Sequence, residues 1–211
     1  DRRDSQAVKE VAHSLKGDAA ILAHYRAVAG ALSIPIVVQD EPVTTGVIMP
    51  PDLIVRIGSE LPACRYVKLE EPPTPTKITA LRRLVASDRP RIFGGMNGMY
   101  FFEELSRGAV GIMTGVAVPD ILVKIYDLFA AGNAAGAAEM YDRYASYIRY
   151  EGQVGVGIAL RKEVLRLRGA IRSSHVRPPG PALDDVTRAE LRATLERAGI
   201  LETRRGIGGG T

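Results

Sequence analysis

A lysine inside an apolar strand is the first side chain of this sequence that can do chemistry. Lys68 lies in the segment RYVKLE, residues 65–70. Alternation along a strand places it on one face with Glu70, opposite its apolar neighbours. Burial favours the neutral form of an amine, which then attacks carbonyl carbons at neutral pH. Lys68 can therefore form a Schiff base. The structural alternative is a strand-end lysine that is ion-paired to Glu70 or a neighbouring carboxylate.

The other candidates stand where further predicted strands end. Functional residues of parallel βα units gather at the C-terminal ends of the strands. The motifs at these ends include QDEP at 39–42, GGMN at 94–97 and MTG at 113–115. We expect five residues to converge at one end of the strands: Gln39, Thr45, Lys68, Gly95 and Thr114.

Two other groups of polar residues are interpreted as non-catalytic. His13, His24 and His175 are scattered, without partners at metal-ligand spacing, so no metal site is predicted. Glu103 and Glu104 are expected on the solvent face of a helix.

Strands and helices alternate through the middle of the chain. Short runs rich in apolar and β-branched residues predict four strands, at Ile34–Gln39, Arg65–Glu70, Arg91–Gly95 and Val110–Thr114. The helices that follow them are predicted at residues 50–60, 77–86, 99–107 and 120–130, with a loop from Asp40 to Met49. Such units imply a parallel sheet with right-handed crossovers. Open doubly wound sheets and closed (β/α)8 barrels both use them.

Helices are predicted on either side of this region. Gln6–Lys16 and Ala19–Leu32 precede the first strand. Ala134–Tyr150, Ile158–Leu167 and Thr187–Ala198 follow the last unit, with Thr187 as the N-cap of the final helix. We therefore predict α/β units in residues 1–132, a helical domain in 133–205 and a tail in 206–211.

Composition excludes several classes of protein. The chain has 211 residues, of which 46% are hydrophobic and 25% charged, a normal balance for a globular protein. The net charge of +4 is mild and its Lys and Arg residues are not clustered, which argues against nucleic acid as a partner. The sequence has no run of about 18 apolar residues, so no membrane span is predicted. The single cysteine, Cys64, requires no oxidising compartment, and the DRRD start does not look like a signal peptide, so a cytoplasmic location is expected.

The ordered set of motifs resembles the dihydrodipicolinate synthase / N-acetylneuraminate lyase family. It comprises AHYRAVA at 23–29, PIVVQDEP at 35–42, TTG at 44–46, YVKLE at 66–70, FGG at 93–95 and GAVGIMT at 108–114. The resemblance implies a (β/α)8 TIM barrel, of which strands five to eight are evident here, followed by a C-terminal helical extension. It implies that Lys68, on the sixth strand, forms a Schiff base with pyruvate or a related 2-oxo acid. No metal or organic cofactor is implied, and a homo-oligomer, dimer or tetramer, is expected.

The family pattern also implies roles for the residues around Lys68. Thr45 is expected to be catalytic with Lys68, as a substrate or proton-relay contact. The substrate-binding residues are expected to be Gln39, Asp40, Glu70, Gly95, Met113 and Thr114.

Two positions depart from the family pattern. Gln39 stands where the family has a proton-relaying tyrosine, and an amide is not an acid or base. The Gln-Asp-x-Pro form resembles the branch that acts on 2-keto-3-deoxy sugar acids, including dehydratases. Gly94-Gly95-Met96 replaces the usual Ser-Gly-Asp.

The carboxylate-binding Gly-Thr-Thr-Gly-Glu loop of the family has no counterpart in this sequence. We expect omitted segments, with a spatial break near Lys16–Gly17, rather than a genuine half barrel. Three functions stay open: a Schiff-base lyase or synthase, a sugar acid dehydratase that uses the same lysine, and a non-enzymatic or regulatory homologue.

Overall fold

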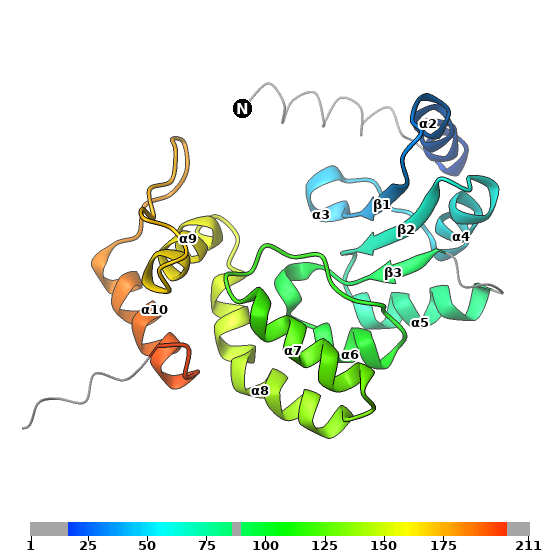
Figure 1. The fold of residues 1–211 in the computed structure, drawn as a ribbon. Coiled ribbons are helices and arrows are strands. Elements are labelled where there is room, and N and C mark those ends of the chain that lie inside the picture. Colours follow the sequence, from blue (N-terminus) through cyan, green and yellow to red (C-terminus); the bar gives the residue numbers. More distant parts are fainter. Residues whose placement is uncertain (1–16, 86–89, 202–211) are drawn as a thin grey trace, which may run out of the picture. The chain divides into compact units, whose positions relative to one another are not determined.

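The computed structural model describes residues 17–85 and 90–201 (Figure 1). Contacts group the chain into two compact units, Asp1–Thr114 and Gly115–Thr211. The division predicted at residues 132 and 133 stays a prediction about the barrel and its helical extension. The predicted helix Gln6–Lys16 lies outside the described residues, and so does one side of the predicted break at Lys16–Gly17.

The first unit is built on a parallel sheet, as predicted. Strands β1 (Ile36–Asp40), β2 (Cys64–Leu69) and β3 (Arg91–Phe93) pair in the order β1-β2-β3. One face of the sheet carries Val38, Val67 and Leu69, which are almost completely buried. These side chains join one core cluster with residues of the helices, including Leu53, Ile57, Ile78 and Leu81.

The fourth predicted strand is reduced to a single parallel bridge, between Gly94 and Ile112. The segment still follows β3, since the Val110 amide donates to Ile92 O and the Met113 amide donates to Gly94 O. Gly111 has a φ of 156°, and a glycine inside a strand interrupts regular pairing. The prediction of a regular strand at 110–114 is therefore wrong, although its place beside β3 is right.

The helices of this unit are α2 (Asp18–Ala31), α3 (Pro42–Thr45), α4 (Pro51–Glu60), α5 (Thr74–Leu84) and α6 (Phe101–Ser106). The predicted loop 40–49 contains α3, with Pro42 at its first position. Helix α5 begins three residues before the prediction, because Pro75 fits the first turn of a helix. The predicted helix 99–107 is shortened to α6, preceded by a 3-10 turn at Met96–Gly98.

The second unit consists of α7 (Pro119–Ala130), α8 (Ala134–Glu151), α9 (Gly157–Leu167) and α10 (Asp185–Arg197). The predicted helices are confirmed to within two residues at each end. The predicted N-cap of the last helix is wrong: Asp184 is the cap, and its Oδ1 accepts from the Thr187 amide at 2.6 Å. Aspartate caps at least as well as threonine, and it stands three residues before the amide it binds.

A buried carboxylate organises this second unit. The Glu151 side chain is fully buried and accepts hydrogen bonds from the Ala117 amide at 3.0 Å, from Arg161 Nε at 2.8 Å and from the Tyr147 hydroxyl. These bonds tie the segment before α7 and the start of α9 to the end of α8.

Candidate functional site

The parallel register places Lys68 at the centre of the sheet. Lys68 pairs with Gln39 of β1 and with Phe93 of β3. Its neighbours Val67 and Leu69 are completely buried among the helices, whereas the Lys68 side chain is 21% exposed on the opposite face. The alternation expected from the sequence is therefore present.

Glu70 joins the polar side chains of this face. Its Oε2 lies 2.9 Å from Lys68 Nζ and accepts from Gln39 Nε2 at 2.8 Å. Its Oε1 accepts from the Met96 amide at 3.1 Å. The side chain is only 12% exposed. The ion pair named above as the structural alternative is thus present, and it also brings a proton acceptor to the amine.

Gly95 gives Glu70 the space that it occupies. A Cβ at this position would overlap Cγ and Oε1 of Glu70. The backbone at the end of β3 therefore approaches the carboxylate closely, and the next amide, that of Met96, donates to it. Gly95 therefore contributes to this group by leaving space for Glu70 and not by a side-chain contact.

The Thr45 hydroxyl forms hydrogen bonds inside its own loop. It donates to Glu41 O at 2.7 Å and accepts from the Val47 amide at 3.1 Å. The structure thus shows Thr45 shaping the turn after β1, and it does not show Thr45 in contact with Lys68. A catalytic role for Thr45 stays a prediction.

Thr114 and Met113 follow the bridged segment beside β3. Thr114 Oγ1 lies 3.5 Å from Asn97 Oδ1, and the Met113 amide donates to Gly94 O at 3.1 Å. Both side chains are half-buried. They stand at the C-terminal end of the strands, as predicted, and their contact with a substrate stays a prediction.

Asp40 lies apart from this group, on the helix-facing side of the sheet. Its side chain is fully buried, and Oδ2 lies 2.7 Å from Lys77 Nζ of α5. Burial raises the pKa of Asp40, and the bond to Lys77 opposes this rise. Alternation from Gln39 already assigns Asp40 to the opposite face. The structure therefore does not bring Asp40 to Lys68, in contrast to the expected substrate contact.

Lys77 was not singled out by the sequence, and its amine is surrounded by acceptors. It donates to Asp40 Oδ2, to Met49 O at 2.6 Å and to Glu71 Oε2. An ammonium group has three N–H donors, so these bonds use all of them. These bonds anchor the Lys77 side chain among its acceptors.

Glu104 was expected in solvent and is instead fully buried. Thr74 Oγ1 donates to its Oε1 at 2.5 Å, whereas its Oε2 has no hydrogen-bond partner among the residues that the structure describes. Burial raises the pKa of Glu104 to about 7. A Cβ on Gly94 would overlap the carboxylate, so the glycine at the end of β3 leaves room for it. The prediction is wrong for Glu104 because adjacent helix positions point in different directions, and Glu103 is the one that faces solvent.

Over residues 17–85 and 90–201, no three side chains of His, Cys, Asp or Glu are grouped in a way that would hold a metal ion. Among the helices of these ranges, none combines the length and apolarity that a membrane span requires.

The comparisons with known proteins agree on one family. The sequence model of the dihydrodipicolinate synthetase family matches residues 16–198. The chain is 32% identical over 187 residues to L-2-keto-3-deoxyarabonate dehydratase of Azospirillum brasilense, covering 89% of this chain and 60% of that protein. It is 29% identical over 201 residues to 4-hydroxy-tetrahydrodipicolinate synthase of Corynebacterium aurimucosum, covering 94% and 64%.

The fold agrees with these matches. The crystal structure of dihydrodipicolinate synthase from Rhodopseudomonas palustris is similar with a TM-score of 0.82 and 38% sequence identity, covering 87% of this chain and 63% of that one. The chain thus spans less than two thirds of the length of these relatives.

Proposed function

Since the chain belongs to the dihydrodipicolinate synthetase family, we propose that the whole protein is a Schiff-base lyase or synthase acting on pyruvate or another 2-oxo acid. The observation that carries this proposal is the Lys68 amine at the end of a central parallel strand, 2.9 Å from the largely buried Glu70 carboxylate. We propose further that the whole protein is a (β/α)8 barrel with a helical extension, located in the cytoplasm as a homo-oligomer.

Lys68 is the nucleophile of the proposed reaction. Its neutral amine adds to the ketone carbon of the 2-oxo acid, and loss of water leaves an imine. The protonated imine withdraws electrons from the adjacent carbon, so the lysine itself serves as the electron sink and no cofactor is needed. Either a C–C bond or a C–O bond next to that carbon can then break.

Glu70 is the group that can move protons in this site. A carboxylate at hydrogen-bond distance from Nζ can take the proton that the ammonium must lose before attack, and can return it when water leaves. Gln39 lies in the place of the family's tyrosine and contacts the same oxygen at 2.8 Å. An amide orients Glu70 without exchanging protons. The acid–base role therefore belongs to Glu70.

A second candidate is a 2-keto-3-deoxy sugar acid dehydratase that uses the same lysine. Two observations favour it: the Gln-Asp-x-Pro motif that begins at Gln39, and the 32% identity to a dehydratase of such an acid. A third reading, a non-enzymatic or regulatory homologue, predicts that no 2-oxo acid reacts with Lys68.

Product analysis separates these functions. The whole protein is incubated with a panel of 2-keto-3-deoxy sugar acids, and separately with pyruvate and an aldehyde, and the products are identified by mass spectrometry. A dehydratase yields a product that is lighter by one water, whereas a lyase yields pyruvate and an aldehyde, and a synthase joins them. Lys68→Ala should remove all three products. No product from the unaltered protein would contradict an enzymatic function.

A further inference from the structure

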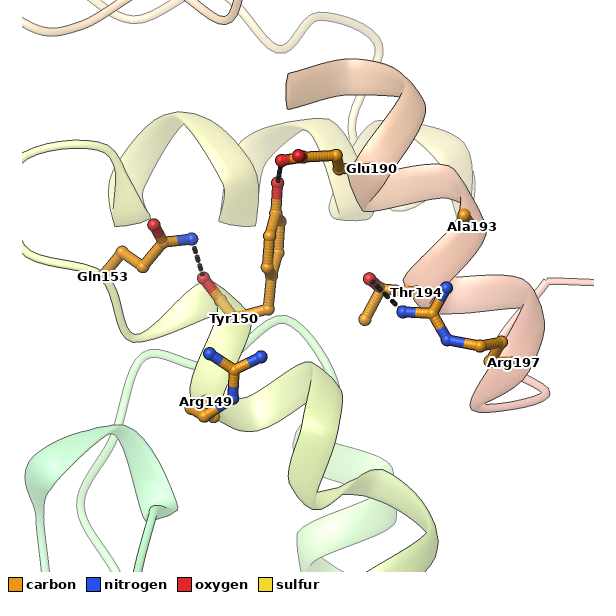
Figure 2. Close-up of a pocket in the computed structure, with 7 residues that line it drawn as sticks. All are labelled: Arg149, Tyr150, Gln153, Glu190, Ala193, Thr194 and Arg197. Carbon is orange, nitrogen blue, oxygen red and sulfur yellow. Dashed lines mark hydrogen bonds between the residues drawn. The ribbon is translucent and has the colours of Figure 1, made fainter. Parts of the chain in front are cut away.

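A polar cavity lies in the second unit, between α8 and α10 (Figure 2). Its volume is about 380 Å³, within the size range of small-molecule sites. The residues around Lys68 belong to the other unit, and none of them lines this cavity. It is lined by Arg149, Tyr150, Gln153, Glu190, Ala193, Thr194 and Arg197.

The cavity exists because one face of α10 carries small residues between long ones. Glu190, Ala193, Thr194 and Arg197 recur at helical spacing of three and four, so they share one face. Leu191 and Leu195 are fully buried and hold the helix in its unit. Ala193 leaves a notch at the centre of the lined face, which a longer side chain would fill.

The cavity walls carry two guanidinium groups that no carboxylate among the described residues neutralises. Figure 2 shows the guanidinium groups of Arg149, from α8, and Arg197, from α10, on two sides of the space. Within residues 17–85 and 90–201, no ion pair joins either of them to a carboxylate. Arg197 donates to Thr194 Oγ1, at 3.1 Å. By contrast, Arg161 and Arg168 of the same unit each pair with a carboxylate.

The carboxylate in the cavity is already engaged by a neutral partner. Glu190 Oε2 accepts from the Tyr150 hydroxyl at 2.9 Å. Burial raises the pKa of Tyr150 to about 12, so this hydroxyl remains a donor at neutral pH. Gln153 donates through Nε2 to Tyr150 O at 2.8 Å, which leaves its Oε1 as an acceptor. The free oxygens of Glu190 and Gln153 can accept hydrogen bonds from hydroxyl groups.

We propose that this cavity binds a small hydroxylated organic acid, with its carboxylate held by Arg149 and Arg197 and its hydroxyls bonded to Glu190 and Gln153. A guanidinium group presents paired N–H donors that match the two oxygens of a carboxylate. Two guanidinium groups against one carboxylate leave one positive charge for the ligand to neutralise. The site is independent of the proposed reaction at Lys68.

Isothermal titration calorimetry with gluconate tests the site. The titration uses the whole protein carrying Lys68→Ala, which removes the amine of the proposed catalytic site as a second partner for the gluconate carboxylate. Gluconate should bind, and Arg149→Gln or Arg197→Gln should each weaken binding about tenfold or more. Ala193→Met, which fills the notch without a change of charge, should also abolish binding. Arg192→Gln is the matched control, because Arg192 lies exposed on α10 outside the cavity lining, and it should leave binding unchanged.

Two further probes separate the parts of the proposal. Sorbitol, which has the hydroxyls without the carboxylate, should not bind, and inorganic phosphate should bind more weakly than gluconate. The proposal is overturned if gluconate does not bind, if its binding survives Ala193→Met and both arginine variants, or if Arg192→Gln weakens it equally. Tighter binding of phosphate would overturn the assignment to a hydroxy acid. Circular dichroism of each variant checks that α8 and α10 remain folded.

Discussion

Two side chains that meet at one oxygen of a third carry the chemistry proposed for this protein. Lys68 and Gln39 both contact Glu70 Oε2, and Gly95 leaves the space that Glu70 fills. The sequence predicted this grouping because alternation along β2 and the ends of parallel strands determine which side chains share a face. It could not predict that Glu70 would bond to both partners, because that depends on the register between β1 and β2.

Glu70→Gln tests the acid–base role. The amide keeps the shape of the carboxylate but cannot take a proton, so kcat should fall by about 10²-fold or more, since general acid–base catalysis contributes about that much. The change should also remove one limb of the pH–rate profile. Steady-state kinetics across pH measure both effects. Glu103→Gln, at an exposed position of α6, is the control and should leave the profile unchanged. An unaltered pH profile in Glu70→Gln would assign proton transfer to another group.

Glu104→Gln tests the buried carboxyl beside Gly94. The folded-state pKa of Glu104, about 7, lies above its ordinary value of 4.5, so the folded state binds the proton more tightly. Its contribution to stability is complete below pH 4.5 and is lost as pH rises through 7, a loss of roughly 3 kcal/mol. Glu104→Gln should therefore flatten the dependence of the unfolding free energy on pH between 4.5 and 7. Urea unfolding at several pH values measures this, and an unchanged slope would show that Glu104 is not the titrating group.

On the face of the sheet opposite the site, a cluster of hydrogen bonds connects the ends of β1 and β2. Lys77 of α5 binds Asp40 at the end of β1, Glu71 just after β2, and the Met49 carbonyl. Asp40 and Glu71 directly follow Gln39 and Glu70 in the chain, so the cluster fixes the backbone that presents these two side chains. The helices and strands were predicted from periodicity, but the cluster was not, because the fold brings its members together from positions up to 37 residues apart.

Lys77→Met tests this cluster. Removal of one partner of a buried ion pair leaves its counter-charges without compensation and typically costs about 3–5 kcal/mol. The free energy of unfolding should fall by about that amount, and kcat should fall while KM changes little. Lys77→Arg, which keeps the charge, should restore part of both. Lys124→Met, which replaces a lysine at an exposed position of α7, is the control. Full stability and kcat in Lys77→Met would show that the cluster does not position the site.

At the scale of the molecule, the parallel α/β order of the first unit and the helices of the second were both predictable from the sequence. The predictions that failed concern single positions: Gly111 interrupts the strand predicted at 110–114, and Asp184 caps the last helix in place of Thr187.

Apolar side chains near the edge strand β1 are exposed, with Ile34 63% and Val37 40% accessible. An exposed apolar strand edge pairs readily with other chains.

The 211-residue chain should therefore associate with itself through β1. Ile34→Lys combined with Val37→Lys places charge at this edge and should shift the chain toward monomer at equal concentration. Light scattering coupled to size-exclusion chromatography measures the mass. Val186→Lys, at an exposed apolar position of α10, is the control and should leave association unchanged. If all three proteins have the same mass, the β1 edge is not the surface that associates.

The central claim is that Lys68 forms a Schiff base with a 2-oxo acid. Borohydride reduction traps an imine as a stable secondary amine, so the whole protein is treated with pyruvate, or with a 2-keto-3-deoxy acid, and borohydride, then digested and analysed by mass spectrometry. One adduct is expected, on the peptide that contains Lys68. No adduct is expected in Lys68→Ala, which lacks the amine, or in Lys68→Arg, because a guanidinium group stays protonated. An adduct that persists in Lys68→Ala, or no adduct on the unaltered protein with either substrate, would contradict this claim.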